Sequence, residues 1–190
     1  GFKITQSNPL KGYSGIFKSR ELGPIEITTP VTCEQQLKSM LAAATVLAKF
    51  GASAKQITEA FSKVQAVPGR MQILKGKNKT TLIDDTYNSS PAAVEAALKT
   101  LYDIDTPERI AVLGSMNELG EASEAEHKKL GELCDAKKLS LVVTVGEEAK
   151  KYLAPVAKKN GCKVESFLNP KLAGEYVKEQ ARQSAVILYK

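Results

Sequence analysis

Short apolar strand patterns alternate with amphipathic helix patterns from residue 71 to the end of the chain, and this alternation constrains the fold more than any other feature. Strands are predicted at 80–84, 109–114, 141–146, 163–167 and 185–188, with a hairpin partner for the first at 71–74. The run 141–146 is almost continuously apolar, which is typical of a strand covered on both faces. Regular alternation with short connections predicts an α/β fold with a mostly parallel, doubly wound sheet.

Residues 1–67 have a different pattern. Short alternating strands at 2–5, 14–18 and 24–28 predict a β-meander, and two helices are expected at 33–50 and from Ser53 to Val64. Three such strands with little apolar content do not form a stable domain alone, so the meander either packs on the next part of the chain or borders a larger structure. Pro68-Gly69-Arg70 breaks the pattern. We therefore expect domains at 1–67 and 71–190, joined by a linker at 68–70.

The composition is that of an ordinary globular protein, with 43% hydrophobic and 25% charged residues among 190. No apolar run approaches the roughly 20 residues of a membrane span, and no secretory signal is visible. The net charge of +6 comes from scattered basic residues without interleaved aromatic residues. This pattern favours an anionic small molecule over nucleic acid as the partner.

The cysteines and the single histidine limit the chemistry that the chain can perform. Cys33, Cys134 and Cys162 are odd in number, widely spaced and without a CxxC pattern, so neither a disulfide framework nor a zinc site is expected. Because His127 is the only histidine, a histidine-based metal cluster or catalytic triad is excluded within these residues. The cysteine pattern is typical of a reducing compartment, and we expect a cytoplasmic protein.

The segment from Thr80 to Pro91 is the strongest candidate for a functional site. It is predicted to be a buried strand that ends in Asp84 and Asp85, then a polar turn, then a helix with Ser90 as its N-cap. Ligands bind at the carboxyl ends of parallel strands, and one carboxylate there suits ribose hydroxyls. Adjacent strand residues point to opposite faces, so only one aspartate is expected to face a ligand. The alternative is that these residues only cap and solvate the turn.

Other polar side chains are expected near the same edge of the sheet. Arg70 could bind a phosphate or carboxylate through its guanidinium, or could be a solvated linker charge. Tyr87 could stack on a base and Asn88 could bind a polar edge, or both could only hold the turn. Glu118 lies after the next strand and could receive a substrate ammonium, or could be an exposed loop charge. His127 is interpreted as a packing or surface residue.

Three segments, taken together and in order, resemble the ATP-dependent Mur ligases of peptidoglycan synthesis. They are Val67-Pro68-Gly69-Arg70-Met71, Ile83-Asp84-Asp85-Thr86-Tyr87-Asn88-Ser89-Ser90-Pro91, and Leu113-Gly114-Ser115-Met116-Asn117-Glu118-Leu119-Gly120 followed by Ser123, Glu124 and His127. The second and third are most similar to members that join D-alanyl-D-alanine to UDP-N-acetylmuramoyl-tripeptide. The resemblance implies that residues 1–67 are the end of the ATP-binding central domain. Residues 71–190 would be a Rossmann-like C-terminal domain, truncated after Lys190.

The resemblance also implies which functional residues lie in this sequence and which lie outside it. Members of the family activate a carboxylate as an acyl phosphate with ATP and Mg²⁺, but no phosphate-binding GxxxxGK[ST] or GxGxxG loop occurs in this sequence. The P-loop and the magnesium ligands are therefore expected upstream of Gly1. No catalytic residue or metal ligand is expected here, and the fragment alone is expected to be inactive. The implied nucleotide contacts are Arg70, Asp85, Tyr87 and Asn88, and the implied contacts to the incoming dipeptide are Ser89, Glu118 and Lys190.

The resemblance leaves some questions open. The family usually carries an asparagine near adenine in the helix expected at 33–50, but Ser39 replaces it, so no adenine contact is assigned. The expected partners are UDP-N-acetylmuramoyl-tripeptide and D-alanyl-D-alanine, with no nucleic acid, and a monomer is expected. Two alternative functions remain. One is a related Mur-type ligase with a different amine acceptor, and the other is a non-catalytic module that binds a nucleotide or a partner.

Overall fold

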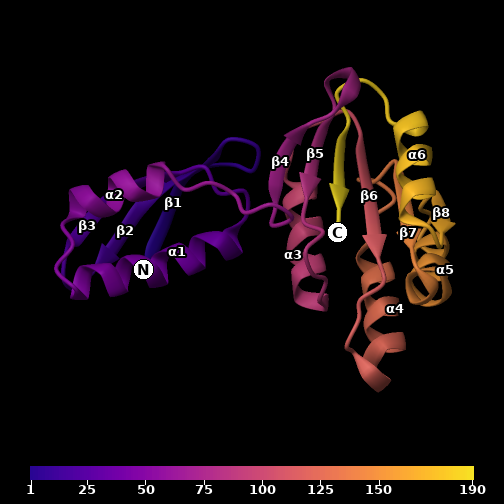
Figure 1. Cartoon of the computed structure of the whole chain (residues 1–190), viewed down its shortest axis with the longest axis horizontal. Coiled ribbons are helices and arrows are strands. Elements are labelled where there is room, and N and C mark those ends of the chain that lie inside the picture. Colours follow the sequence, from indigo (N-terminus) through magenta and orange to yellow (C-terminus); the bar gives the residue numbers. More distant parts are fainter. The chain divides into compact units, whose positions relative to one another are not determined.

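The computed structural model describes residues 1–190, which form two compact units, residues 1–67 and 68–190 (Figure 1). The division falls at Pro68, inside the stretch that separates the two sequence patterns. Gly69 has a φ of +72°, a backbone conformation that glycine adopts without steric cost.

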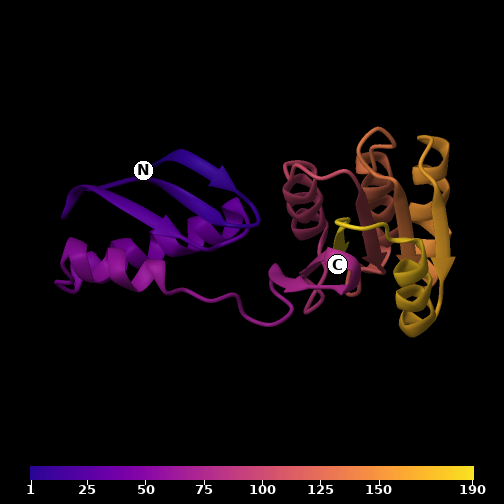
Figure 2. The same cartoon turned by 90° about the horizontal axis from the view of Figure 1, so that it is seen from above.

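The first unit is a three-stranded antiparallel sheet with two helices on one face (Figure 2). Its elements are β1 (Phe2–Asn8), β2 (Gly12–Ser19), β3 (Gly23–Thr29), α1 (Glu34–Lys49) and α2 (Ala54–Ser62). Side chains of the sheet and of both helices share one core, made of Phe17, Ile25, Ile27, Ala44, Ala48, Ile57 and Phe61. The predicted meander therefore packs on the two helices that come after it in the chain.

The start of α2 follows from a local pattern, since Ser53-Ala54-Lys55-Gln56 in the sequence predicts a capping box. Gln56 N–H donates to Ser53 Oγ at 3.4 Å, and Ser53 N–H donates to Gln56 Oε1 at 2.9 Å. These two bonds form a capping box, which satisfies N–H groups that the first turn of the helix leaves unpaired. Gly51, with a φ of +88°, reverses the chain between α1 and α2.

The second unit contains a six-stranded sheet in the order β4-β5-β9-β6-β7-β8. The strands are β4 (Gln72–Lys75), β5 (Thr81–Asp84), β6 (Arg109–Gly114), β7 (Leu141–Val145), β8 (Val164–Phe167) and β9 (Val186–Tyr189). Only β4 runs antiparallel to its neighbour, and all the other pairs are parallel. The mostly parallel α/β sheet and the first hairpin predicted from the sequence are confirmed.

Helices cover both faces of this sheet, so it is doubly wound as predicted. The helices are α3 (Pro91–Tyr102), α4 (Ser123–Leu133), α5 (Ala154–Lys159) and α6 (Pro170–Gln180), and short helical turns lie at Lys77–Lys79, Gly120–Ala122 and Ala149–Leu153. Ala173 and Val177 of α6 pack on one face, against Ile110, Val112, Leu141, Val143 and Ile187. The other helices, α3, α4 and α5, lie on the opposite face (Figure 2).

The position of β9 decides which segments meet at the carboxyl edge of the sheet. Although it is last in the chain, β9 inserts between β5 and β6, with Val186 opposite both Thr81 and Arg109. The end of β9 at Lys190 therefore lies between the turn after β5 and the loop after β6. These three segments form the candidate functional site.

Two helix ends differ from the sequence prediction because residues distant in the sequence form hydrogen bonds there. Ser123-Glu124-Ala125-Glu126 has the sequence of a capping box, which predicts Ser123 as the N-cap of a helix to about Lys138. In the structure Ser123 is the first residue of α4, Ala122 is the N-cap, and the Ser123 hydroxyl donates to Glu148 Oε2 instead. The helix ends at Leu133. Tyr102 Oη donates to the Leu133 carbonyl at 2.8 Å and accepts from Asp135 N–H at 3.2 Å. These bonds hold the chain away from a helical path.

Ser90 occupies the predicted N-cap position of α3, but its side chain makes no capping hydrogen bond. The proline at the first helical position and the extended backbone of Ser90 (φ −138°, ψ 157°) start this helix. Asn169 before Pro170 is an N-cap pattern in the sequence. Asn169 does cap α6, since its Oδ1 accepts from Lys171 N–H at 2.8 Å and from Leu172 N–H.

Two helical glycines provide a matched test of the packing in the second unit. A methyl group on Gly131 of α4 would lie 2.7 Å from the carbonyl oxygen of Leu153, whereas one on Gly174 of α6 would meet nothing within 4 Å. We expect Gly131→Ala to lower the free energy of unfolding by about 1–3 kcal/mol because it overpacks the interface. Gly174→Ala should raise it by up to about 1 kcal/mol through helix propensity.

Urea denaturation of the two variants beside the parent chain measures both effects. A neutral or stabilising Gly131→Ala would contradict the close packing between α4 and the segment from Leu153 onward.

Candidate functional site

A pocket of about 290 Å³ opens at the carboxyl edge of the sheet in the second unit, and we call it the edge pocket. One wall is the turn after β5, from Thr86 to Ser89, and the other is formed by Gly114 at the end of β6 with Ser115 and Asn117 after it. Tyr189 and Lys190 at the end of β9 lie between these walls. The pocket therefore lies where parallel α/β sheets bind their ligands.

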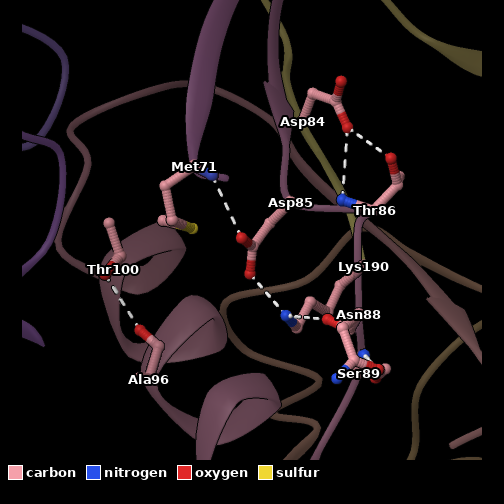
Figure 3. Close-up of polar contacts among 9 residues, drawn as sticks. All are labelled: Met71, Asp84, Asp85, Thr86, Asn88, Ser89, Ala96, Thr100 and Lys190. Carbon is pink, nitrogen blue, oxygen red and sulfur yellow. Dashed lines mark hydrogen bonds and ion pairs between the residues drawn. The ribbon is translucent and has the colours of Figure 1, made fainter. Parts of the chain in front are cut away.

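Asp85 and Lys190 form a buried ion pair at the back of this edge (Figure 3). Lys190 Nζ lies 2.6 Å from Asp85 Oδ2, and the side chains are 2% and 10% exposed respectively. Asp85 Oδ1 accepts from Met71 N–H at 3.0 Å, and Lys190 Nζ also donates to the Asn88 carbonyl at 2.7 Å. One charge pair thus connects the residue after the linker, the turn after β5 and the end of β9.

The two adjacent aspartates point in different directions, as expected for neighbouring residues at a strand end. Asp84 turns away from the ion pair, and its Oδ1 accepts from Thr86 N–H at 3.2 Å and Thr86 Oγ1 at 2.7 Å (Figure 3). Asp84 therefore stabilises the turn from outside. Asp85 is the inward carboxylate, but both of its oxygens already accept a hydrogen bond from the chain.

Arg70 and Tyr87 form an exposed pair beside the pocket. The Arg70 guanidinium carbon lies 4.2 Å from the centre of the Tyr87 ring, and Tyr87 is 71% exposed. Tyr87 N–H donates to the Gly69 carbonyl at 3.1 Å, so the linker runs along the turn. A cation over an aromatic face is attracted to the ring electrons, which holds the guanidinium at the surface, where it can contact an anion.

Ser89 carries an unusual polar atom. Its Oγ is shielded from solvent and has no hydrogen-bond partner, and it is the one buried side-chain nitrogen or oxygen in the chain of which this is true. Ser89 lines the edge pocket. A buried polar group without a partner is unfavourable, so a ligand that donates to or accepts from this hydroxyl would be stabilised.

The loop after β6 presents different residues from those predicted from the sequence. Glu118, which the sequence places at the border of the crevice, is exposed and does not line the pocket, whereas Asn117 and Ser115 do. Glu118 has a φ of +65°, a backbone conformation uncommon for residues other than glycine. Asn117 is not among the predicted residues, although an amide side chain shortly after a strand is a signal that could have found it.

Tyr189 adds a phenol to the lining of the edge pocket. Burial raises the pKa of the Tyr189 phenol, so at neutral pH it is an uncharged group that can donate or accept a hydrogen bond. No group of three or more histidine, cysteine, aspartate or glutamate side chains in the chain could hold a metal ion.

None of the helices combines the length and the apolar character that crossing a bilayer requires.

The residues predicted from the sequence fall into four places. Tyr87, Asn88, Ser89 and Lys190 line the edge pocket together. Arg70 lies next to it through its contact with Tyr87. Asp85 lies behind Lys190, and Glu118 lies outside the pocket on the neighbouring loop. Residues that the sequence did not single out, such as Asn117 and Tyr189, complete the lining.

The fold and the site define a Rossmann-like domain with a polar pocket at the carboxyl edge of its parallel sheet. The sequence profile described as Mur ligase, glutamate ligase domain matches residues 69–190. The chain belongs to this family, and the family expected from the sequence motifs is thereby confirmed.

Individual relatives agree with this assignment. The chain is 31% identical over 127 residues to the UDP-N-acetylmuramoyl-tripeptide–D-alanyl-D-alanine ligase of Escherichia coli, covering 67% of this chain and 28% of that protein. It is 37% identical over 127 residues to the enzyme of the same name from Mycobacterium tuberculosis, covering 64% of this chain and 25% of that protein. The chain therefore spans about a quarter of the length of these curated relatives.

Solved structures share the fold over the whole chain. A crystal structure of MurF from Acinetobacter baumannii superposes with a TM-score of 0.82 at 25% identity, covering 100% of this chain and 42% of that one. The MurF ligase of Thermotoga maritima, solved in complex with ADP, superposes with a TM-score of 0.81 at 22% identity, covering 100% and 42%. The second likeness, at its lower identity, shows the fold alone.

Removing one partner of the buried ion pair should destabilise the second unit strongly. We expect Asp85→Ala and Lys190→Ala each to lower the free energy of unfolding by about 3–5 kcal/mol, since each leaves a buried charge unpaired. The control is Glu124→Ala, which breaks the exposed Glu124–Lys128 pair and should cost less than about 0.5 kcal/mol.

Thermal and urea unfolding of the variants measure these differences. If Asp85→Ala were as stable as Glu124→Ala, the ion pair would not hold this edge of the sheet.

Proposed function

We propose that this chain is part of an ATP-dependent ligase that joins D-alanyl-D-alanine to the peptide carboxylate of UDP-N-acetylmuramoyl-tripeptide in peptidoglycan synthesis. The observation that carries the proposal is the edge pocket, whose two walls are the segments 86–89 and 114–117 that resemble the family. The names of the E. coli and M. tuberculosis relatives support this choice of substrates.

The size and lining of the edge pocket suit the amine substrate. Its volume of about 290 Å³ lies at the small end of ligand pockets, which fits a dipeptide better than a whole nucleotide. Ser89 Oγ lacks a partner inside the chain and is available to the dipeptide, and Asn117 offers an amide that can both donate and accept. Glu118, on the adjoining loop, is the carboxylate we assign to the dipeptide ammonium. Lys190 closes the floor of the pocket.

The nucleotide is assigned to the turn after β5 and the linker that runs beside it. The Arg70 guanidinium, held over the exposed Tyr87 ring, would contact ATP phosphates, and Tyr87 and Asn88 would border the nucleotide. We assign Asp85 to the ribose hydroxyls, since each carboxylate oxygen accepts one bond from the chain and retains a further lone pair. Bound ATP would supply the phosphoryl group that activates the substrate carboxylate as an acyl phosphate.

In this scheme the residues of the chain position the reactants. Holding the amine beside the activated carboxylate converts a bimolecular step into an effectively intramolecular one. Because no cluster of side chains here could hold a metal ion, we assign the Mg²⁺ ligands and the phosphate loop to sequence upstream of Gly1, and we derive no step through the metal. We further propose that the whole protein acts in the cytoplasm as a monomer.

Substituting the two charged residues at the rim tests the assignment. In the full-length protein, Arg70→Ala should lower kcat/KM for ATP by about tenfold or more, and Glu118→Gln should do the same for the dipeptide. Arg20→Ala and Glu121→Ala, which remove exposed charges of the same type, are the matched controls. A change of less than about threefold, under about 1 kcal/mol of transition-state stabilisation, would show that the residue is wrongly assigned.

An acceptor screen separates the proposal from a related Mur-type ligase. The full-length enzyme with its UDP-linked peptide should form product with D-alanyl-D-alanine and not with single amino acids such as L-lysine, D-glutamate or L-glutamate. Preferred ligation of a single amino acid would favour the related ligase.

Calorimetry of the 190-residue chain separates the proposal from a non-catalytic nucleotide-binding module. We expect weak or no binding of ATP, because the phosphate loop is assigned upstream. Tight binding of ATP by the chain alone would favour the module.

A further inference from the structure

The loop from Ser115 to Gly120, here called the amine loop, carries a backbone conformation that its own sequence does not favour. Glu118 has a φ of +65° and Gly120 a φ of +52°. Glycine adopts such angles readily, but a glutamate does so only when its surroundings hold it there. Glu118 is itself exposed, so the constraint must come from the residues on either side of it.

The N-terminal part of the amine loop is tied down by three hydrogen bonds. Ser115 N–H donates to the Val145 carbonyl at 2.9 Å, and Ser115 Oγ accepts from Ala149 N–H at 3.1 Å. Met116 N–H donates to Nε2 of His127 at 3.0 Å. The last of these bonds lies closest to Asn117 and Glu118, and it is the one supplied by a side chain of α4.

His127 is fully buried, and both of its ring nitrogens are engaged. Nδ1 lies 2.8 Å from the carbonyl oxygen of Ser123, which can only accept, so Nδ1 carries the proton. Nε2 is then an acceptor, as the bond from Met116 N–H requires. Ser123 Oγ lies 3.2 Å from Nδ1, but it donates its proton to Glu148 Oε2 at 2.8 Å. The hydroxyl therefore does not donate to Nδ1.

We propose that His127 is a positioning residue, which fixes the amine loop through a neutral imidazole protonated at Nδ1 and so places Asn117 and Glu118 at the rim of the edge pocket. The assignment of a substrate to this loop rests on the proposed function, but the anchoring of the loop does not. An apolar side chain of similar size would fill the same space and leave the buried Met116 N–H without a partner. Packing alone therefore does not account for a histidine here.

The tautomer can be measured directly, without any activity. His127 is the only histidine of the chain, so ¹⁵N-histidine labelling of the 190-residue protein yields one set of ring signals. We expect at neutral pH a protonated Nδ1, an unprotonated Nε2 and a coupling across the hydrogen bond to Met116 N–H. A proton on Nε2, or a rapidly averaging ring, would overturn the proposal.

Variants separate anchoring from space filling. A glutamine at this position can place an amide oxygen near the site of Nε2 and accept from Met116 N–H, whereas phenylalanine cannot. Amide exchange at residues 116–119 should therefore be at least about tenfold faster in His127→Phe than in His127→Gln, with β6 and β7 equally protected in both. Equal exchange at 116–119 in the two variants would overturn the proposal, even if His127→Phe were less stable overall.

Kinetics of the full-length protein then test the placement of the rim residues. His127→Phe should raise KM for the dipeptide by about tenfold while KM for ATP stays within about threefold, and His127→Gln should recover most of the difference. Ser123→Ala, which keeps the carbonyl that orients the ring, is the control and should change neither value by more than about threefold. Equal increases in both KM values would overturn the positioning role. If the parent enzyme failed to ligate any amine, the proposed function would be wrong. The ring signals and the amide exchange would still test whether His127 anchors the amine loop.

Discussion

The ion pair between Asp85 and Lys190 holds together the edge of the sheet on which the site depends. It connects the residue after the linker, the turn after β5 and the end of β9 through charge-assisted hydrogen bonds to Met71 and Asn88. A buried pair of this kind offsets its desolvation only while both partners and their further hydrogen bonds are present. The turn that carries Tyr87, Asn88 and Ser89 therefore depends on this pair as well as on the Asp84–Thr86 and Tyr87–Gly69 hydrogen bonds.

The two walls of the edge pocket are held by different means. A charged pair fixes the wall after β5, whereas the wall after β6 is fixed by neutral hydrogen bonds to Ser115 and His127. On each side, buried residues hold the backbone while their neighbours present polar groups to the pocket. This arrangement allows a small pocket to keep its shape before the ligand arrives, which lowers the ordering cost of binding.

The sequence predicted the elements better than their ends. The β–α alternation and the capping box at Ser53 depend on neighbouring residues alone, and both are confirmed. The expected cap at Ser123 and the expected length of α4 are wrong, since Glu148 and Tyr102 reach those positions from other elements. Asn117 lines the edge pocket and its neighbour Glu118 does not, a difference that only the path of the loop in the fold shows.

By itself, the sequence determined the class of fold, the order of its elements and the strand ends at which polar residues gather, because periodicity and turn residues act over short stretches of chain. Only the tertiary structure decided which of those polar residues stabilise the backbone at the edge of the sheet and which face the pocket. Asp85 and Lys190 are far apart in the chain and meet because β9 inserts between β5 and β6. The physical reason is that the free-energy cost of burying a charge depends on the groups that the fold places around it, and so does the partner that a buried N–H finds. A local sequence pattern contains no information about those groups.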